Sequence, residues 1–120
     1  MRIFWIGAFL ASGLVSAQAQ SAGDWVLAKW KNGAHWFPGV VQSVSGDKVT
    51  VKYDDGERET LFVNSVRPYD WKVGSKIECN FKNAGAWYSG RITALNAEAL
   101  SIAYDDGDKE NTTTGRCRSS

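Results

Sequence analysis

The sequence predicts an all-β chain of two small antiparallel barrels in tandem, after a cleavable apolar signal helix at the N-terminus. One observation is an internal repeat, because Tyr53-Asp54-Asp55-Gly56 returns unchanged as Tyr104-Asp105-Asp106-Gly107, 51 positions later. A second is that short runs of alternating apolar residues are separated by turn residues, a period typical of strands. A third is the apolar stretch that begins the chain. Together they indicate a leader followed by a duplicated β unit.

The first 19 residues resemble a secretory signal. Arg2 precedes an apolar run at 3–15, and Ala17 and Ala19 form a small-residue cleavage site before Gln20. The run is shorter than the roughly 20 residues needed to span a bilayer, so we expect cleavage rather than membrane anchoring. The prediction is a secreted or periplasmic protein with no membrane insertion after signal cleavage.

The duplication sets the domain organisation. At the same offset, Trp36-Phe37-Pro38-Gly39 matches Trp87-Tyr88-Ser89-Gly90 and Glu59 matches Glu110, and no gap is needed. Such regular self-similarity indicates a tandem repeat. We expect a signal peptide at 1–19, a first barrel at 20–69, a linker at 70–73 and a second barrel at 74–120. The linker contains Trp71, so we expect the two units to be packed or restrained.

The first unit contains a complete set of strands. Its alternation and turn signals predict strands at 25–30, 36–44, 48–53 and 57–62, then one helical turn at 63–66 and a closing strand at 67–69. Pro38-Gly39 is expected to bend the second strand, since proline cannot donate to a ladder. Asp55-Gly56 is a hairpin signal, because both residues tolerate positive φ. Four strands and a short fifth favour a strongly bent sheet or barrel.

The second unit repeats the strands but changes the ending. Strands are expected at 76–82, 87–95, 98–104 and 108–113, after which polar residues replace the apolar closure of the first unit. Cys79 and Cys117 stand where the first unit has Ala28 and Val66. In an exported chain two cysteines are most simply a disulfide. Closing a loop of about 40 residues would add around 4 kcal/mol of stability.

Charge and residue types argue against several function classes. The chain has 14 basic and 13 acidic residues, and Arg2 would leave with the signal, so the remainder is close to neutral. This balance argues against nucleic-acid binding. The single histidine, His35, is expected in an exposed loop of the unit that lacks cysteine, so neither a metal site nor a nucleophile–base pair is repeated. We expect a monomeric, non-catalytic protein without a cofactor.

Several duplicated residues carry a family resemblance. Lys29-Trp30, Trp36-Phe37-Pro38-Gly39, the strand and turn at 49–56, and Val66-Arg67-Pro68 together resemble a Tudor domain, and the pair resembles a tandem Tudor. The likeness covers nearly all of the chain after the signal. It implies two five-stranded SH3-like barrels that act as binding modules. Tudor domains often bind methylated lysine or arginine in an aromatic cage.

The resemblance implies a ligand-binding set in each unit. The first cage would contain Trp30, Phe37, Tyr53 and Asp55, and the second Phe81, Tyr88, Tyr104 and Asp106. Aromatic faces attract a methylated ammonium, and a carboxylate adds charge. The neighbouring Trp36 and Trp87 have the opposite strand parity, so they should point away from the cages.

Besides cation recognition, two alternatives remain open at the level of sequence. The aromatic residues could fill the barrel cores, and the Asp-Asp-Gly pairs could serve only as turns. The protein could then be a structural or interaction protein of the cell envelope that recognises no small cation. Nucleic-acid binding by interleaved lysines and aromatics is counted third among the hypotheses. The predicted partner is a protein or peptide, with a methylated side chain as the favoured target.

Overall fold

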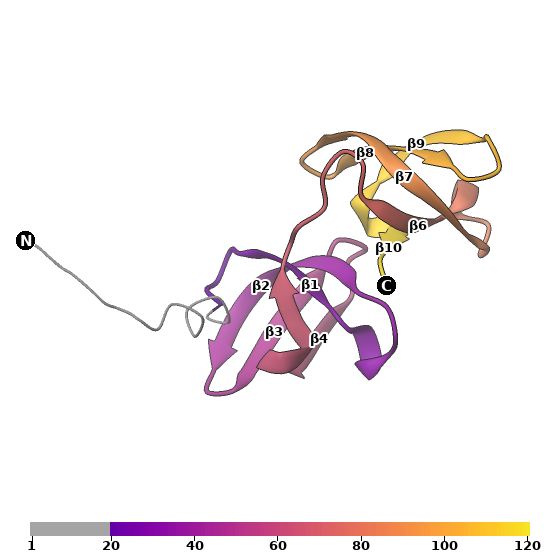
Figure 1. The fold of residues 1–120 in the computed structure, drawn as a ribbon. Coiled ribbons are helices and arrows are strands. Elements are labelled where there is room, and N and C mark those ends of the chain that lie inside the picture. Colours follow the sequence, from indigo (N-terminus) through magenta and orange to yellow (C-terminus); the bar gives the residue numbers. More distant parts are fainter. Residues whose placement is uncertain (1–19) are drawn as a thin grey trace, which may run out of the picture.

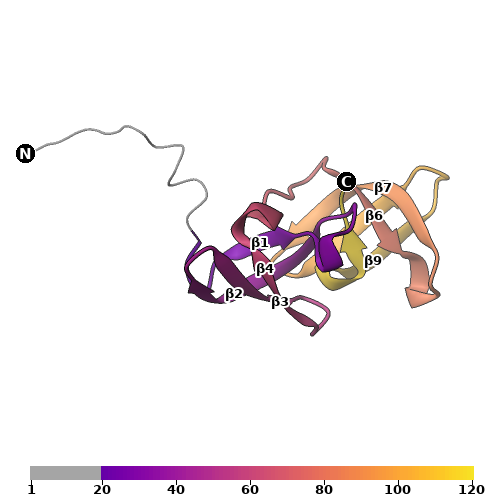
Figure 2. The ribbon, with the colours of Figure 1, turned by 90° about the horizontal axis from the view of Figure 1, so that it is seen from below.

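The computed structural model describes residues 20–120 (Figures 1 and 2). The predicted signal peptide at 1–19 lies outside the described residues. Within the described part of the chain, no helix is long and apolar enough to cross a membrane. Two β units lie next to each other, joined by the segment that follows Pro68 (Figure 1).

The first unit is a five-stranded antiparallel barrel of the SH3-like type. Its strands follow the order β4-β3-β2-β1-β5. The bounds are β1 Trp25–Ala28, β2 Phe37–Ser45, β3 Lys48–Tyr53, β4 Arg58–Phe62 and β5 Val66–Pro68, with the 3₁₀ turn η3 at Val63–Ser65. The predicted strands and the helical turn before the closing strand are therefore confirmed, with small shifts at their ends.

The second unit has the same topology. Its sheet order is β10-β6-β7-β8-β9, which is the order of the first unit read from the other edge. The bounds are β6 Lys76–Asn80, β7 Trp87–Asn96, β8 Ala99–Tyr104, β9 Lys109–Thr113 and β10 Cys117–Arg118, with the 3₁₀ turn η5 at Thr114–Arg116. The all-β fold class of two five-stranded barrels is confirmed.

The first strand of each unit ends earlier than predicted. A one-turn 3₁₀ segment follows it, η2 at Trp30–Asn32 and η4 at Phe81–Asn83. Lys31 and Lys82 have positive φ values of 51° and 53°, a left-handed conformation that a strand cannot contain. Trp30 and Phe81 therefore lie on tight turns rather than on strands.

Each unit depends on one glycine where the second strand crosses the third. A Cβ at Gly39 would lie 2.7 Å from the Lys52 carbonyl oxygen, and a Cβ at Gly90 would lie 2.5 Å from that of Ala103. Any side chain would force the strands apart. The predicted bend at Pro38-Gly39 is thus a close backbone approach, and the strand bulges a few residues later, between Val41 and Ser43.

The two hydrophobic cores are connected. The first barrel is filled by side chains such as Val26, Val49 and Val51. The core of the second barrel extends beyond that barrel, because Leu27 of the first unit and Trp71 of the joining segment belong to it. Trp71 is 6% exposed, and its indole N–H donates to Ser119 Oγ at 3.3 Å. The joining segment is therefore packed rather than a free spacer, as its tryptophan predicted.

The disulfide closes the second barrel. Cys79 and Cys117 are bonded to each other and stand opposite one another in β6 and β10. Both are fully buried, like Ala28 in the first barrel. The predicted pairing is confirmed, and the cross-link holds a two-residue strand to the sheet.

Reduction should weaken this barrel. The bond closes a loop with a sequence separation of 38, for which chain entropy gives about 4 kcal/mol. We expect the free energy of unfolding to fall by about that amount when reductant is added, measured by urea unfolding with tryptophan fluorescence. A Cys79→Ala/Cys117→Val variant, which carries the residues of the first barrel, should not respond to reductant. Equal stability of the wild type with and without reductant would contradict the role given to the bond.

Candidate functional site

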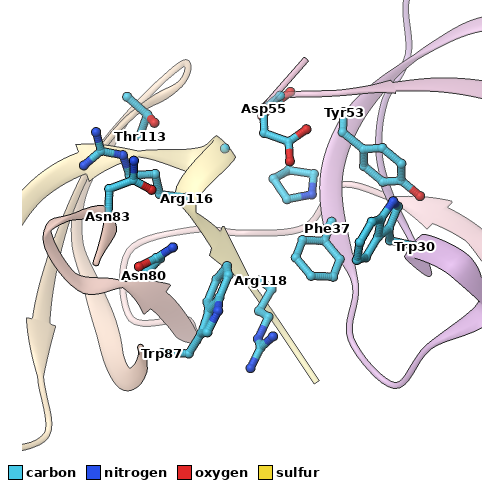
Figure 3. A pocket seen from close by; sticks show the side chains of 13 residues that line it. Trp30, Phe37, Tyr53, Asp55, Asn80, Asn83, Trp87, Thr113, Arg116 and Arg118 are labelled. Carbon is cyan, nitrogen blue, oxygen red and sulfur yellow. The ribbon is translucent and has the colours of Figure 1, made fainter. Parts of the chain in front are cut away.

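Three aromatic side chains meet at one end of the first barrel (Figure 3). Trp30 comes from η2, Phe37 from the start of β2 and Tyr53 from the end of β3. The ring centroids of Trp30 and Phe37 are 6.1 Å apart at 71°, and those of Phe37 and Tyr53 are 6.5 Å apart at 85°. We call these residues cage one. Because the rings meet at steep angles, they form the walls of a concave site rather than a flat stack.

The second barrel contains the equivalent group. Phe81, Tyr88 and Tyr104 are mutually close to perpendicular, with centroid separations of 6.2, 5.5 and 6.4 Å. We call these residues cage two. They line a surface pocket of about 130 Å³ together with Asp106 and Asp108. The structure thus brings together all the aromatic residues that the resemblance implied.

The alternative that the aromatics fill the core applies to only some of them. Tyr53 and Tyr104 are 4% and 5% exposed and belong to the two cores. Trp30 and Tyr88 are 40% and 48% exposed. Each cage therefore has a fixed wall that is part of the core and an open wall that faces solvent.

A duplicated glutamate holds each cage in place. The Tyr53 hydroxyl donates to Glu59 Oε1 at 2.7 Å, and Glu59 Oε2 accepts the Lys31 backbone N–H at 2.9 Å. Glu110 binds Tyr104 and the backbone of Lys82 in the same way, at 2.7 and 2.9 Å. The carboxylate ties the turn that carries one cage wall to the tyrosine that forms another. The sequence showed the repeat of Glu59 and Glu110 but not this role.

The cage tyrosines are held in their neutral form. Burial, and then the hydrogen bond to Glu59, raise the pKa of Tyr53 above its usual value. The same two causes, with Glu110 as the partner, raise the pKa of Tyr104. Neither phenol carries a negative charge near neutral pH, so the hydroxyls act as donors to the glutamates.

The second aspartate of each repeat stabilises a turn. Asp55 Oδ1 accepts the Glu57 N–H at 3.0 Å, and Asp106 Oδ1 accepts the Asp108 N–H at 3.0 Å. Asp55 also lines the same cavity as cage one, and Asp106 lines that of cage two. The predicted turn role is confirmed, and each carboxylate is exposed beside its cage.

The tryptophans of opposite parity point away from the cages of their own barrels. Trp87 is absent from the lining of the cage-two pocket and lies instead 6.2 Å from Phe37, at 88°. The Arg118 guanidinium stands over the Trp87 ring at 4.1 Å, and Arg67 stands over Trp36 at 4.3 Å. Trp87 therefore forms a wall of the first barrel's site although it belongs to the second barrel.

Cage one opens into a cleft between the barrels (Figure 3). The cavity has a volume of about 570 Å³. One wall is formed by cage one with Pro38, Asp54 and Asp55. The other contains Asn80, Asn83, Trp87, Thr113, Gly115, Arg116 and Arg118. The two repeated cages thus differ in surroundings, because cage one faces a second wall while cage two lies on the surface.

Contacts between the barrels fix the width of this cleft. Trp36 and Ser119 exchange two backbone hydrogen bonds of 2.8 and 2.9 Å. Thr114 Oγ1 donates to Asp54 Oδ2 at 2.5 Å, and a Cβ at Gly115 would lie 2.9 Å from the Asp54 carbonyl oxygen. His35, expected to be exposed, is half-buried with its Nε2 3.6 Å from Glu78 Oε1 of the second barrel. The sequence did not reveal these contacts, because their partners lie far apart along the chain.

Within residues 20–120, no cluster of His, Cys, Asp and Glu side chains is arranged to hold a metal ion.

The contact between Asp54 and Thr114 should respond to charge. Burial raises the pKa of the Asp54 carboxyl, and the hydrogen bond from Thr114 opposes this shift. A folded-state pKa above the unfolded value means that the ionised group disfavours folding at neutral pH, and that this cost disappears as the pH falls below the unfolded pKa. Asp54→Asn keeps an oxygen acceptor, so its stability at pH 7 should equal or exceed that of the wild type.

Asp54→Ala should cost about 1–3 kcal/mol, because the buried Thr114 hydroxyl loses its acceptor. Urea unfolding of both variants at pH 7 and pH 4 measures these effects. Asp105→Asn, at the exposed equivalent position in the second barrel, is the control and should change stability little. An Asn variant that is as damaged as the Ala variant would contradict this account of the contact.

Residues 24–70, which span the first barrel, match the family model of the Agenet domain. No curated protein sequence matches the chain. Among solved structures, the crystal structure of ADCP1 tandem Agenet domain 3-4 is 21% identical, with 89% of this chain and 84% of that chain covered and a TM-score of 0.42. The crystal structure of Arabidopsis thaliana AGDP1 AGD34 is 20% identical, with 89% and 86% covered and a TM-score of 0.43.

Proposed function

We propose that the chain is an exported, non-catalytic binding protein whose aromatic cages recognise cationic groups, with methylated lysine or arginine as the favoured targets. The observation that carries this proposal is the duplicated cage. Each barrel contains three steeply angled rings with an acidic side chain beside them. The match of the first barrel to the Agenet domain supports the same class of function.

The chemistry of the cages suits a methylated ammonium. Aromatic faces attract a cation electrostatically, by about 0.5–2 kcal/mol for each favourable contact. Methyl groups reduce the hydration of an ammonium and bring apolar surface to the rings, so a methylated side chain loses less on leaving water. The nearby carboxylates Asp55 and Asp106 add long-range attraction and can accept a remaining N–H.

One ring of each cage lies within cation–π distance of a lysine, although neither lysine lines the cavity of its cage. Lys31 Nζ lies 5.0 Å from the centroid of a Trp30 ring, and Lys82 Nζ lies 5.3 Å from that of Phe81. These contacts support the proposal only by showing that both rings attract a cation electrostatically.

The disulfide supports the proposal of export. Disulfides persist in oxidising compartments and are rare in the reducing cytosol. Cys79 and Cys117 are both used in this bond, and no free cysteine is found in the described residues. Together with the apolar leader at 1–19, this favours a secreted or periplasmic location.

Peptide titration tests the proposed recognition. We expect peptides containing trimethyllysine or dimethylarginine to quench or shift tryptophan fluorescence, and unmethylated peptides to bind more weakly. Trp30→Ala should weaken binding at cage one and Tyr88→Ala at cage two, each by roughly three- to thirtyfold, because one cation–aromatic contact is lost. These two residues are preferable to the buried tyrosines because their removal leaves the cores intact.

Trp25→Ala provides the matched control. Trp25 is 51% exposed, packs on Tyr69 and lines neither cage. Its replacement should leave affinity unchanged. Absence of any response to methylated peptides, or a response that Trp30→Ala and Tyr88→Ala do not alter, would rule out cation recognition. Such a result would favour an interaction protein of the cell envelope.

A further inference from the structure

We propose that the cleft between the barrels selects a peptide carrying two charges, a methylated ammonium held by cage one and a nearby carboxylate held by Arg116. This inference rests on the proposed function, because it assigns cage one the cationic part of the ligand. It adds a second recognition element, on the second barrel, that makes the peptide's acidic group part of the specificity.

The two walls of the cleft carry opposite charges. The wall from the first barrel contributes Asp54 and Asp55 and no basic side chain. The wall from the second barrel contributes Arg116 and Arg118 and no acidic side chain. A purely cationic peptide would be attracted to one wall and repelled by the other. A ligand whose cation faces the first wall and whose anion faces the second wall matches both.

A neutral side chain on the second wall also presents donors. Asn80 Oδ1 accepts the Gly85 N–H at 2.8 Å, which fixes the orientation of the amide. Its Nδ2 therefore remains available toward the cavity, where Figure 3 shows the Asn80 side chain. An amide N–H₂ on the same wall as an arginine favours an oxygen acceptor such as a carboxylate.

The two arginines have different roles. Arg118 stacks on Trp87 at 4.1 Å and its Nε donates to Glu78 at 2.8 Å, so its charge is already partly balanced. Arg116 is exposed and, among residues 20–120, has no hydrogen-bond or ion-pair partner for its side chain. An unpaired guanidinium can bind a carboxylate through two parallel hydrogen bonds. Arg116 is therefore the anion-binding residue.

The backbone of Arg116 is held at the cleft by its neighbours. Thr114, two residues earlier in η5, donates a hydrogen bond to Asp54, and Gly115 packs against the Asp54 backbone. On the other side Cys117 is fixed by the disulfide. The charge is therefore presented by a restrained turn rather than by a free loop, which lowers the entropic cost of using it.

The repeat shows that this arrangement belongs to the cleft alone. Arg118 has the equivalent Arg67, which also stacks on a tryptophan, but the residue equivalent to Arg116 is Ser65. The pocket of cage two contains Asp106 and Asp108 and no basic residue. Cage two should accordingly accept a cation without regard to an accompanying carboxylate, and it serves as an internal reference.

A matched peptide series tests the proposal. Peptides with one trimethyllysine would carry a single glutamate at each position from −3 to +3, and a second series would carry glutamine there. The protein would have cage two disabled by Tyr88→Ala, so that binding reports cage one. We expect glutamate at one or more positions to strengthen binding by about five- to tenfold over glutamine, because a charged acceptor forms a hydrogen bond roughly twice as strong as a neutral one does.

Arg116→Ser, which installs the residue of the first barrel, should abolish the preference for glutamate, while glutamine peptides still bind through cage one. Arg58→Ser removes an exposed arginine that does not line the cleft, and it should retain the preference. Free trimethyllysine, a small zwitterion, is the control for the peptide assignment. If this amino acid alone binds more tightly than the glutamine peptides, the target is a small zwitterion and the peptide assignment is wrong.

The failures of the two proposals differ. If no trimethyllysine peptide binds, cation recognition at cage one is wrong. If glutamine peptides bind and lose affinity with Trp30→Ala, but glutamate gives no advantage at any position, the cage is correct and the carboxylate site is wrong. A glutamate preference that persists in Arg116→Ser would equally overturn the assignment to Arg116.

Discussion

The cleft depends on the disulfide between β6 and β10. A strand of two residues, Cys117–Arg118, has little hydrogen bonding of its own, and the covalent bond holds it in the sheet. The residues on both sides of Cys117 make the contacts between the barrels, Thr114 with Asp54 and Ser119 with Trp36. One cross-link within the second barrel thus holds the segment that contacts the first barrel, and the packing of Leu27 and Trp71 in the second core joins the barrels as well. The spacing of the two cleft walls depends on these contacts together.

Duplication has produced two similar cages in different environments. The hydrogen bond from the cage tyrosine to the glutamate is repeated with an equal length of 2.7 Å, so the local structure of each cage is preserved. Only cage one faces the other barrel, because only Asp54 meets η5, whereas its equivalent Asp105 pairs with Lys76 at 3.2 Å on the surface. The same sequence motif therefore has an interface role in one copy and a surface role in the other.

Sequence alone predicted much of the fold, because strand alternation, turn residues and the 51-residue offset are local or repeated signals. It also grouped the cage residues, because the resemblance to Tudor domains assigns each of them by its position in the repeat. It missed the contact of Asp54 with Thr114, the half-buried His35 and the part that Trp87 plays in the first barrel's site. These features depend on how two units pack, and no periodicity within one unit encodes that packing.

The aromatic residues could be interpreted either as barrel core or as cage walls. In the folded protein one residue can be both. Tyr53 is buried among the valines of the first barrel, yet its ring is a wall of cage one and its hydroxyl is fixed by Glu59. A wall that is already ordered by core packing loses no further rotamer freedom when a ligand binds. The ordering cost falls only on the open walls, Trp30 and Tyr88. Small barrels can therefore support a preorganised cage because the residues that stabilise them also form the site.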